Sequence, residues 1–335
     1  MSTFLPHIGL DIGSQTIKAV ILSRKKDQWA ILGFGKIPTP GKGLASETKE
    51  EIAEVSTAIS KLIKDFKINI KEVTIGLPES QIFTRVIEMP IMTETEMASA
   101  VKWEAEQYIP IPLSEVSMDF TILEKYEADN KMSVLLVAAP LSLIEKYKHI
   151  ISGADLTLSA IETETTSLSR AFMDTEDLAP VTVIVDIGGG SSCMAIVKKG
   201  SLAFTRSISV GGINLTRAVA QNLSISEQQA ENYKITYGLE KDKLDGKVRE
   251  AILPIIEILT SELKRGINAY QTKDKDNPVQ RIVLAGGTCL LPDLVVYLTE
   301  ETGIETQVGN PGFPEIGIDA PHFSLAVGLA KREEE

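Results

Sequence analysis

A segment near the start of the sequence combines an aspartate, a glycine turn and polar side chains. Asp11 follows the apolar letters IGL and precedes Gly13, Ser14 and Gln15. Because glycine has no side chain beyond Cα, such a turn allows backbone N–H groups to approach an anion closely. Asp11 would repel a phosphate directly, but a carboxylate here can hold Mg²⁺ through the waters that the ion retains. The pattern indicates a phosphate and magnesium site, and a plain β-hairpin turn is the alternative.

The same pattern returns in the segment VIVDIGGGSS, where Asp186 again ends a β-branched run. The residues that follow it are Gly188, Gly189, Gly190, Ser191 and Ser192. Consecutive glycines in a regular element cost about 0.5–1 kcal/mol each, so we interpret them as a place of close backbone approach. A mobile loop is the alternative. Two such loops, each led by an aspartate, indicate a phosphate site more specifically than either loop alone.

Two further features could complete a nucleotide site. Lys18 lies in the apolar run after the first turn, from which its amine could reach a β- or γ-phosphate. Gly286, Gly287 and Thr288 follow the apolar letters VLA and precede a predicted helix. A base or an α-phosphate could lie against this bare backbone at the helix N-terminus. Taken alone this third motif is weak, because strand–Gly–Gly–helix turns are common.

The periodicity of the chain predicts the elements that would position these residues. Residues 8–37 read as three strands, and residues 47–66 as an amphipathic helix with Ser46 as its N-cap. Residues 82–156 read as an insert with the order strand, helix, strand, strand, helix, in which Thr93 and Glu96 form a capping box. The first pattern then restarts, which predicts two similar α/β halves.

Composition narrows the class of protein. The 335 residues include 34 Lys and Arg against 46 Asp and Glu, a net charge of −12. This balance argues against nucleic-acid binding and against polybasic attachment to anionic lipid. Two cysteines give neither a disulfide framework nor metal-ligand spacing, which favours a reducing compartment. The sequence shows no secretory signal and no apolar run long enough to span a bilayer, so we expect a soluble, cytoplasmic protein.

The order of the segments LDIGS…K, ETTSLSRA, VDIGGGSS, LAGGT and AVGLA resembles the nucleotide-binding segments of the actin, heat-shock chaperone and sugar-kinase ATPase superfamily. The resemblance implies an α/β, actin-like (ribonuclease H-like) duplicated two-domain fold with ATP and Mg²⁺ in the cleft between the domains. It implies that Asp11 and Asp186 hold the metal through water, that Lys18 binds phosphate and that Glu164 orients the attacking water. The adenosine loop would be formed by Gly286, Gly287 and Thr288.

The segment EQQAENYKITYG resembles the superfamily helix whose glutamate and lysine hold the ribose and the base. This implies those roles for Glu231 and Lys234, with an exposed i, i+3 ion pair as the alternative. At the segment that contains Glu164, the superfamily pattern has an aspartate where this chain has Glu162. The resemblance leaves open whether ATP is hydrolysed slowly or only bound.

The insert is similar to subdomain 1C of the FtsA and PilM branch, and the letters WEAEQYIP resemble PilM proteins of type IV pilus assembly. A cell-division FtsA homologue and an actin-fold small-molecule kinase are the alternatives. The resemblance implies four subdomains. They are 1A (1–81, 157–179 and 321–335), 1C (82–156), 2A (180–212 and 281–320) and 2B (213–280).

The resemblance also implies a cytoplasmic scaffold that a partner brings to the inner membrane, with no direct membrane insertion. The partner would be the cytoplasmic N-terminal peptide of PilN, bound between 1A and 1C. Other pilus assembly proteins and self-association are further options. Candidate partner-binding residues are Trp103, Glu104, Gln107 and Tyr108. For Trp103 we prefer the alternative, a place in the core of the insert.

Overall fold

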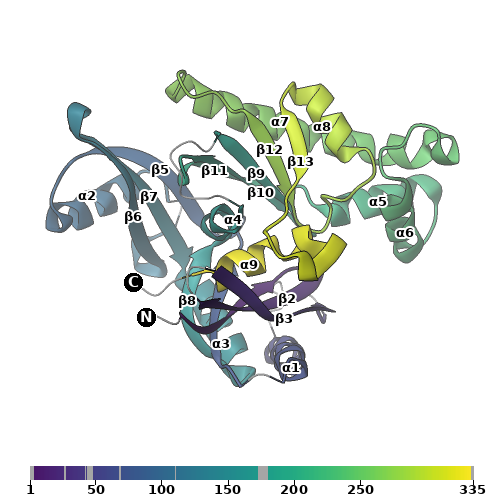
Figure 1. Ribbon diagram of the computed structural model, residues 1–335, viewed down its shortest axis with the longest axis horizontal. Coiled ribbons are helices and arrows are strands. Elements are labelled where there is room, and N and C mark those ends of the chain that lie inside the picture. The colour runs from purple at the N-terminus through teal and green to yellow at the C-terminus, as the bar shows by residue number, and fades with distance from the viewer. Residues whose placement is uncertain are drawn as a thin grey trace.

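The structure is a computed structural model that describes residues 4–25, 28–41, 43, 48–67, 69–109, 111–172 and 180–332 (Figure 1). The strands are β1 (Phe4–Ile12), β2 (Thr16–Lys25), β3 (Gln28–Pro38), β4 (Glu72–Leu77), β5 (Phe83–Pro90), β6 (Val116–Tyr126), β7 (Lys131–Pro140), β8 (Thr157–Thr163), β9 (Thr182–Ile187), β10 (Ser192–Lys198), β11 (Ser201–Ile208), β12 (Arg281–Ala285) and β13 (Glu305–Val308). The α-helices are α1 (Lys49–Asp65), α2 (Glu94–Glu106), α3 (Leu141–Gly153), α4 (Glu164–Phe172), α5 (Gly212–Leu223), α6 (Glu227–Tyr237), α7 (Lys247–Lys273), α8 (Leu294–Thr302) and α9 (Ser324–Ala330).

Two sheets in the described part of the chain share one layout. The first has the order β3-β2-β1-β4-β8 and the second the order β11-β10-β9-β12-β13. In each, a three-stranded antiparallel meander continues into two parallel strands. Strands β1 and β9 therefore occupy equivalent central places, with Asp11 and Asp186 near their carboxyl ends. The predicted duplicated α/β fold is confirmed.

The last helix, α9, packs unusually close to the first sheet. A Cβ on Gly9 of β1 would collide with the carbonyl oxygen of Ala326, and a Cβ on Gly328 would collide with that of Ser167. Glycine is required at both positions because backbone meets backbone there. This close packing explains the small residues of the AVGLA segment, and it fixes α4 against α9. Helices α1 and α3 are packed with this sheet in one buried apolar cluster.

The insert contains a third sheet with the order β5-β7-β6, and the predicted order of its elements is confirmed. Met97, Val101 and Ala105 of α2 bury one face of this sheet. The capping box of Thr93 and Glu96 at the start of α2 is confirmed. The helix α3, which the sequence groups with the insert, packs instead on the first sheet through Leu143 and other apolar residues.

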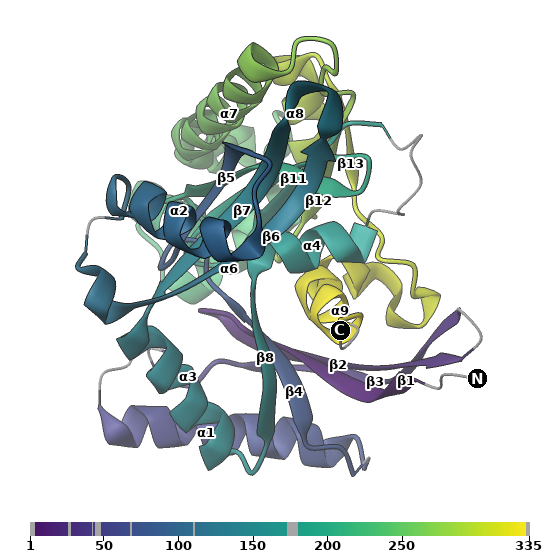
Figure 2. The ribbon, with the colours of Figure 1, turned by 90° about the vertical axis from the view of Figure 1, so that its left-hand side faces the viewer.

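The other face of the insert sheet lies against the second domain (Figure 2). Leu135 of β7 is buried in a cluster with Cys193, Val197 and Leu202, whereas its neighbour Leu136 faces the α2 side. Because β7 is covered on both faces, its sequence is a continuous apolar run rather than an alternating one. The insert thus touches both halves of the molecule.

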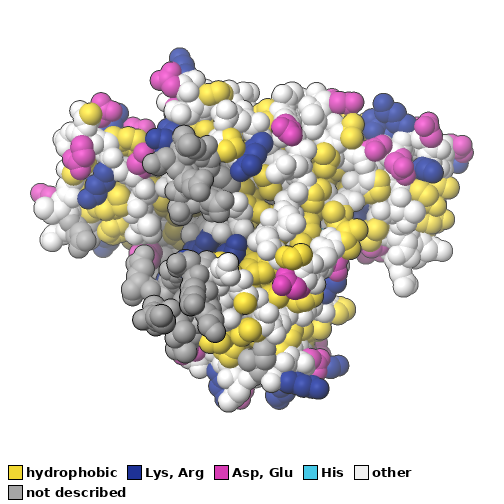
Figure 3. All heavy atoms as spheres, viewed as in Figure 1, with side chains coloured by type: hydrophobic (Ala, Val, Ile, Leu, Met, Phe, Trp, Pro, Cys, Tyr) yellow, Lys and Arg dark blue, Asp and Glu magenta, His cyan; other side chains and the backbone are white. Residues whose placement is uncertain are grey.

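Helix α1 begins with Thr48 as its N-cap, and the predicted cap Ser46 lies outside the described residues. Among the described helices, none combines the length and the apolar character needed to cross a membrane. On the face drawn in Figure 3, acidic and basic side chains are interspersed over the outer ends of the insert and of the second domain.

Candidate functional site

The two glycine hairpins touch each other. In each, the first glycine donates its N–H to the carbonyl three residues later, Gly13 to Thr16 and Gly188 to Ser191, both at 3.1 Å. A Cβ on Gly189 would lie 2.7 Å from Oγ of Ser14, so the bare backbone of this glycine leaves room for that side chain. The predicted phosphate loops, distant in sequence, are therefore in contact.

Buried charges gather beside these hairpins. Asp11 and Lys18 are register partners on β1 and β2, and Nζ of Lys18 donates to Oδ2 of Asp11 at 2.7 Å. Burial by itself lowers the pKa of Lys18, but the charges of Asp11, Asp186 and Glu164 outweigh it and raise that pKa above its usual value. The four predicted residues thus act on one another electrostatically, as a phosphate and metal site requires.

Two of the carboxyls bind protons unusually tightly. Burial, and then the charge of Asp186, raises the pKa of Glu164 well above its usual value. Burial and the charge of Asp11 raise the pKa of Asp186 to about 6, although Lys18 opposes this. Carboxyls in this state are stabilised by gaining either a proton or a cation. Within the described residues, no three His, Cys, Asp or Glu side chains are grouped as direct metal ligands.

Glu162 has a different surrounding from Glu164. Its carboxylate accepts two hydrogen bonds of 2.8 Å from the guanidinium of Arg170, one of 2.8 Å from Ser167 and one of 2.5 Å from Arg332. Burial raises the pKa of Glu162, but these partners together outweigh burial and lower it below its usual value. Where the superfamily pattern has an aspartate, this chain thus uses glutamate to tie β8 and α4 to the residues after α9.

The predicted ribose and base residues lie on α6. Nζ of Lys234 donates to Oε2 of Glu231 at 2.7 Å and to Oγ1 of Thr216 at 3.0 Å, and Glu231 also accepts from Thr216. Lys234 is buried, so the alternative of an exposed ion pair is wrong for the lysine, while Glu231 is partly open to solvent. A Cβ on Gly212 would lie 2.7 Å from Oγ1 of Thr288 and 3.4 Å from Nζ of Lys234. The α6 pair and the predicted adenosine loop are therefore neighbours.

The adenosine loop itself differs from the expectation in one respect. Gly286 has a φ of +85°, and a Cβ there would lie 2.7 Å from Oδ1 of Asp186, which places this loop beside the second hairpin. The prediction that the loop opens a helix is wrong. Helix α8 begins only at Leu294, after Pro292 and after Asp293, whose φ is +61°. The helix dipole of α8 is thus displaced from Gly286, Gly287 and Thr288.

One buried carboxyl beside Glu164 was not predicted. Glu79 follows β4, and its N–H donates to Oε2 of Glu164 at 3.1 Å. Its side chain accepts from Oγ1 of Thr165 at 2.5 Å. The signal that could have identified it is its position directly after a buried strand that runs parallel to β1, since such strands end at the same edge of the sheet.

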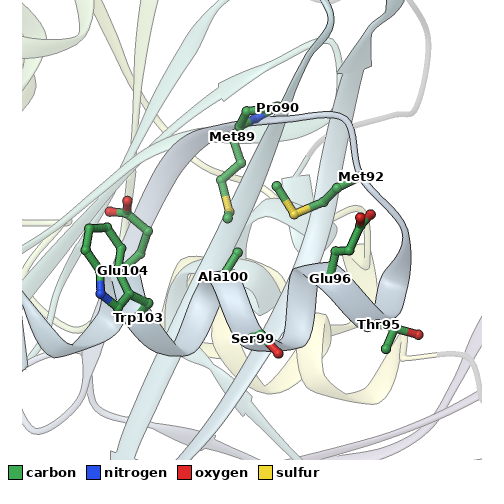
Figure 4. Close-up of a pocket in the computed structure, with 9 residues that line it drawn as sticks. All are labelled: Met89, Pro90, Met92, Thr95, Glu96, Ser99, Ala100, Trp103 and Glu104. Atoms are coloured by element: carbon green, nitrogen blue, oxygen red, sulfur yellow. The ribbon is translucent and has the colours of Figure 1, made fainter.

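A groove of about 700 Å³ lies on the insert, away from the hairpins (Figure 4). It is lined by Met89, Pro90, Met92, Thr95, Glu96, Ser99, Ala100, Trp103 and Glu104. Two of the four candidate partner-binding residues, Trp103 and Glu104, line it. The side chain of Trp103 is 65% exposed, so its predicted place in the core is wrong.

The other two candidates lie at the end of α2, outside this groove. Gln107 is the exposed C-cap of the helix. The ring of Tyr108 stacks on Phe83 with centroids 6.4 Å apart, and the guanidinium of Arg85 lies 3.9 Å from its centre. Tyr108 therefore holds α2 against β5, which is a packing role.

Comparisons with known proteins agree with this architecture. The cell-division protein FtsA of Enterococcus hirae is 21% identical, over 96% of this chain and 82% of FtsA. MreB 5 of Spiroplasma citri bound to AMPPNP has the same fold, with a TM-score of 0.55 at 15% identity over 96% of this chain and 94% of MreB. A PilM–PilN type IV pilus biogenesis complex gives a TM-score of 0.83 at 26% identity over 97% of both chains.

The family comparison covers almost the entire sequence. The model of the family described as type IV pilus assembly protein PilM matches residues 9–333. That range contains both hairpins, the insert and the adenosine loop. The chain therefore belongs to the PilM family of type IV pilus assembly proteins.

Proposed function

We propose that this protein is a nucleotide-binding scaffold of the type IV pilus assembly machinery, with ATP and Mg²⁺ held between its two halves. The observation that carries the proposal is the contact between two equivalently closed hairpins, Gly189 against Ser14, beside the buried carboxyls of Asp11 and Asp186. The AMPPNP bound by MreB 5, which has the same fold, supports the nucleotide. The predicted division into subdomains 1A, 1C, 2A and 2B is part of this proposal.

In this proposal the hairpins and the lysine bind the phosphates. The N–H groups of Gly13 and Gly188 close the two turns, so the backbone N–H groups at Ser14 and Gln15 and at Gly189 to Ser191 would donate to phosphate oxygens. Lys18 adds a positive charge. Asp11 and Asp186 hold Mg²⁺ through water, and the ion, when bound, supplies charge neutralisation. The excess of buried carboxyls over the lysine fits such a cation.

The base and the ribose occupy the other end of the cleft. Glu231 and Lys234 hold them from α6, and the loop of Gly286, Gly287 and Thr288 provides the opposite backbone surface. Burial and the charge of Asp186 raise the pKa of Glu164, which favours its protonated form and weakens it as a base for activating water. In this proposal ATP is bound and is at most slowly hydrolysed.

The insert provides the surface for a partner. The PilM–PilN complex, in which the matched chain is 26% identical to this one, supports PilN as that partner. The family resemblance implies that its cytoplasmic N-terminal peptide makes the contact. Trp103 is a suitable anchor because large exposed aromatic side chains beside a groove are typical of binding hot spots. Such a partner would bring this protein to the cytoplasmic side of the inner membrane.

Calorimetric titration with ATP in the presence and absence of Mg²⁺ tests the nucleotide part of the proposal. We expect Mg²⁺-dependent binding that Asp186→Ala weakens about tenfold or more, since it removes one of the two metal-holding carboxyls. Asp65→Ala, at an exposed aspartate on α1, is the control and should bind as the wild type does. Equal affinity of the Asp186→Ala variant would show that the metal assignment is wrong.

A further inference from the structure

Glu79 lies at the root of the insert, between β4 and β5, and is only 4% exposed. One oxygen of its carboxyl, Oε1, accepts from Oγ1 of Thr165 at 2.5 Å. The other, Oε2, accepts from Oγ1 of Thr84 at 2.5 Å. Its N–H donates to Oε2 of Glu164 at 3.1 Å. Glu79 thus contacts the carboxyl of Glu164, the helix α4 that carries Glu164, and β5, the first strand of the insert.

The segment from Glu79 to Thr84 also contacts the second domain. Oγ1 of Thr84 lies 3.2 Å from Oγ1 of Thr205 on β11. Oγ of Ser191, in the second glycine hairpin, donates to Oγ of Ser80 at 3.4 Å. The residues from Glu79 to Thr84 therefore connect three parts of the molecule: the cleft, the insert and the second sheet.

The hydrogen bonds on the two carboxyl oxygens of Glu79 depend on each other. A buried carboxyl is costly unless its oxygens are hydrogen-bonded, and here two hydroxyls satisfy them. Burial raises the pKa of Glu79, and the hydrogen bonds from Thr165 and Thr84 partly oppose this. Loss of the Thr84 hydroxyl leaves Oε2 unsatisfied, whereas Oε1 also accepts from the N–H of Thr165 at 3.4 Å. Because one buried carboxyl holds both sets of contacts, the two sides of Glu79 are energetically coupled.

We propose that Glu79 is a positioning residue that couples the occupancy of the nucleotide cleft to the placement of the insert. The inference rests on the proposed binding of Mg-ATP beside Glu164. When a ligand changes the position of the Glu164 carboxyl, the hydrogen-bonded N–H of Glu79 follows it. The side chain of Glu79 then transmits the change to Thr84 and β5. By reciprocity, a partner bound to the insert changes the affinity of the cleft for nucleotide by the same factor.

Hydrogen exchange of the full-length protein, measured with and without saturating Mg-ATP, tests this coupling. The segments to follow are β5 and α2, which lie in the insert and outside the cleft. In the wild type we expect Mg-ATP to slow their exchange about fivefold or more, a coupling of ordinary allosteric size. Thr84→Val should abolish this response while the affinity for ATP, measured by calorimetry, stays within about threefold. Glu79→Gln should do the same.

Thr84→Ser is the matched control, because it keeps the hydroxyl that donates to Glu79 and should restore the response. A purely structural role of Thr84 would alter the exchange rates equally with and without ATP, and this outcome would overturn the inference. The inference would also be overturned if calorimetry shows that the wild type binds ATP but the exchange of β5 and α2 does not respond. The proposed nucleotide site would stand in that case. A wild type that binds no ATP would overturn the proposed function and the inference together.

Discussion

Nζ of Lys18 donates to Oδ2 of Asp11 at 2.7 Å, directly across the strand pair that forms the first glycine hairpin. Both side chains are close to 90% buried, at 12% and 11% exposure. The lysine is thus held in place by the carboxyl that we assign to the metal. In the proposed function, a cation that balanced the charge of Asp11 would leave Lys18 available to a phosphate.

The first prediction concerns this pair. Lys18→Met should lower the free energy of unfolding by about 3 kcal/mol, because it leaves the buried carboxyl of Asp11 without its partner. It should also weaken ATP binding. Urea unfolding measures the first effect. Lys36→Met is the matched control, since Lys36 lies beside Lys18 on β3 but pairs with Asp319 in a half-exposed ion pair, which should contribute less than about 1 kcal/mol. Equal losses in the two variants would contradict the assignment.

The second prediction concerns pH. The pKa of Asp186 is raised to about 6 in the folded protein, so the folded state binds the proton more tightly than the unfolded state. The stabilisation is complete below the unfolded pKa of about 4 and is lost as pH rises through about 6. Without Mg²⁺, the wild type should lose on the order of 2 kcal/mol relative to Asp186→Asn between pH 4 and pH 7. Urea unfolding of both proteins in a chelator across this range measures the difference, and parallel pH profiles would count against it.

The third prediction concerns the contact between the hairpins. A methyl group at Gly189 would lie 2.7 Å from both Oγ of Ser14 and Cγ of Gln15, so Gly189→Ala must either displace these side chains or separate the hairpins. We expect the affinity for Mg-ATP to fall about tenfold or more, because the phosphate donors on the two hairpins no longer converge. Gly76→Ala is the control, since its methyl group would meet neighbours at ordinary contact distances of 3.7 Å or more. Calorimetry that finds equal ATP affinities in the two variants would argue against binding by both hairpins.

The fourth prediction separates two aromatic residues of the insert. Trp103→Ala should change the free energy of unfolding by less than about 0.5 kcal/mol, because the side chain is mostly exposed. It should weaken binding of a PilN N-terminal peptide about tenfold or more if Trp103 is an anchor. Tyr108→Ala should instead destabilise the insert, since it removes the stacking on Phe83 and the contact with Arg85.

Fluorescence anisotropy of a labelled peptide measures the partner affinity of these variants. Val296→Ala, at an exposed apolar residue of α8, is the control and should bind the peptide as the wild type does. Unchanged affinity of the Trp103→Ala variant would exclude this groove as the peptide site.

The hairpins were the most predictable part of the molecule, because an aspartate after a β-branched run and before glycine is a local signal. The place of Trp103 was not predicted correctly. Met97, Val101 and Ala105 recur every four residues and fill the buried stripe of α2, and Trp103 lies off that stripe. Local sequence also could not show that α3 packs on the first sheet. That choice depends on which apolar surface the fold brings near it.

The role of Glu79 shows a second limit of sequence reasoning. Its partners Thr84 and Thr165 are far apart in sequence from each other, and their hydroxyls meet one carboxyl only after β4, β5 and α4 are assembled. The start of α8 was misplaced for a more local reason. The segment after Gly286 first forms turns, and Pro292 and Asp293 delay the helix to Leu294.

A crystal structure of the protein with AMPPNP and Mg²⁺ tests the central claim most directly. The account predicts phosphate oxygens within hydrogen-bond distance of backbone N–H groups in both hairpins, at Ser14 and Gln15 and at Gly189 to Ser191. It also predicts a magnesium ion whose waters contact Asp11 and Asp186. A nucleotide bound elsewhere, or held by one hairpin alone, would contradict the account.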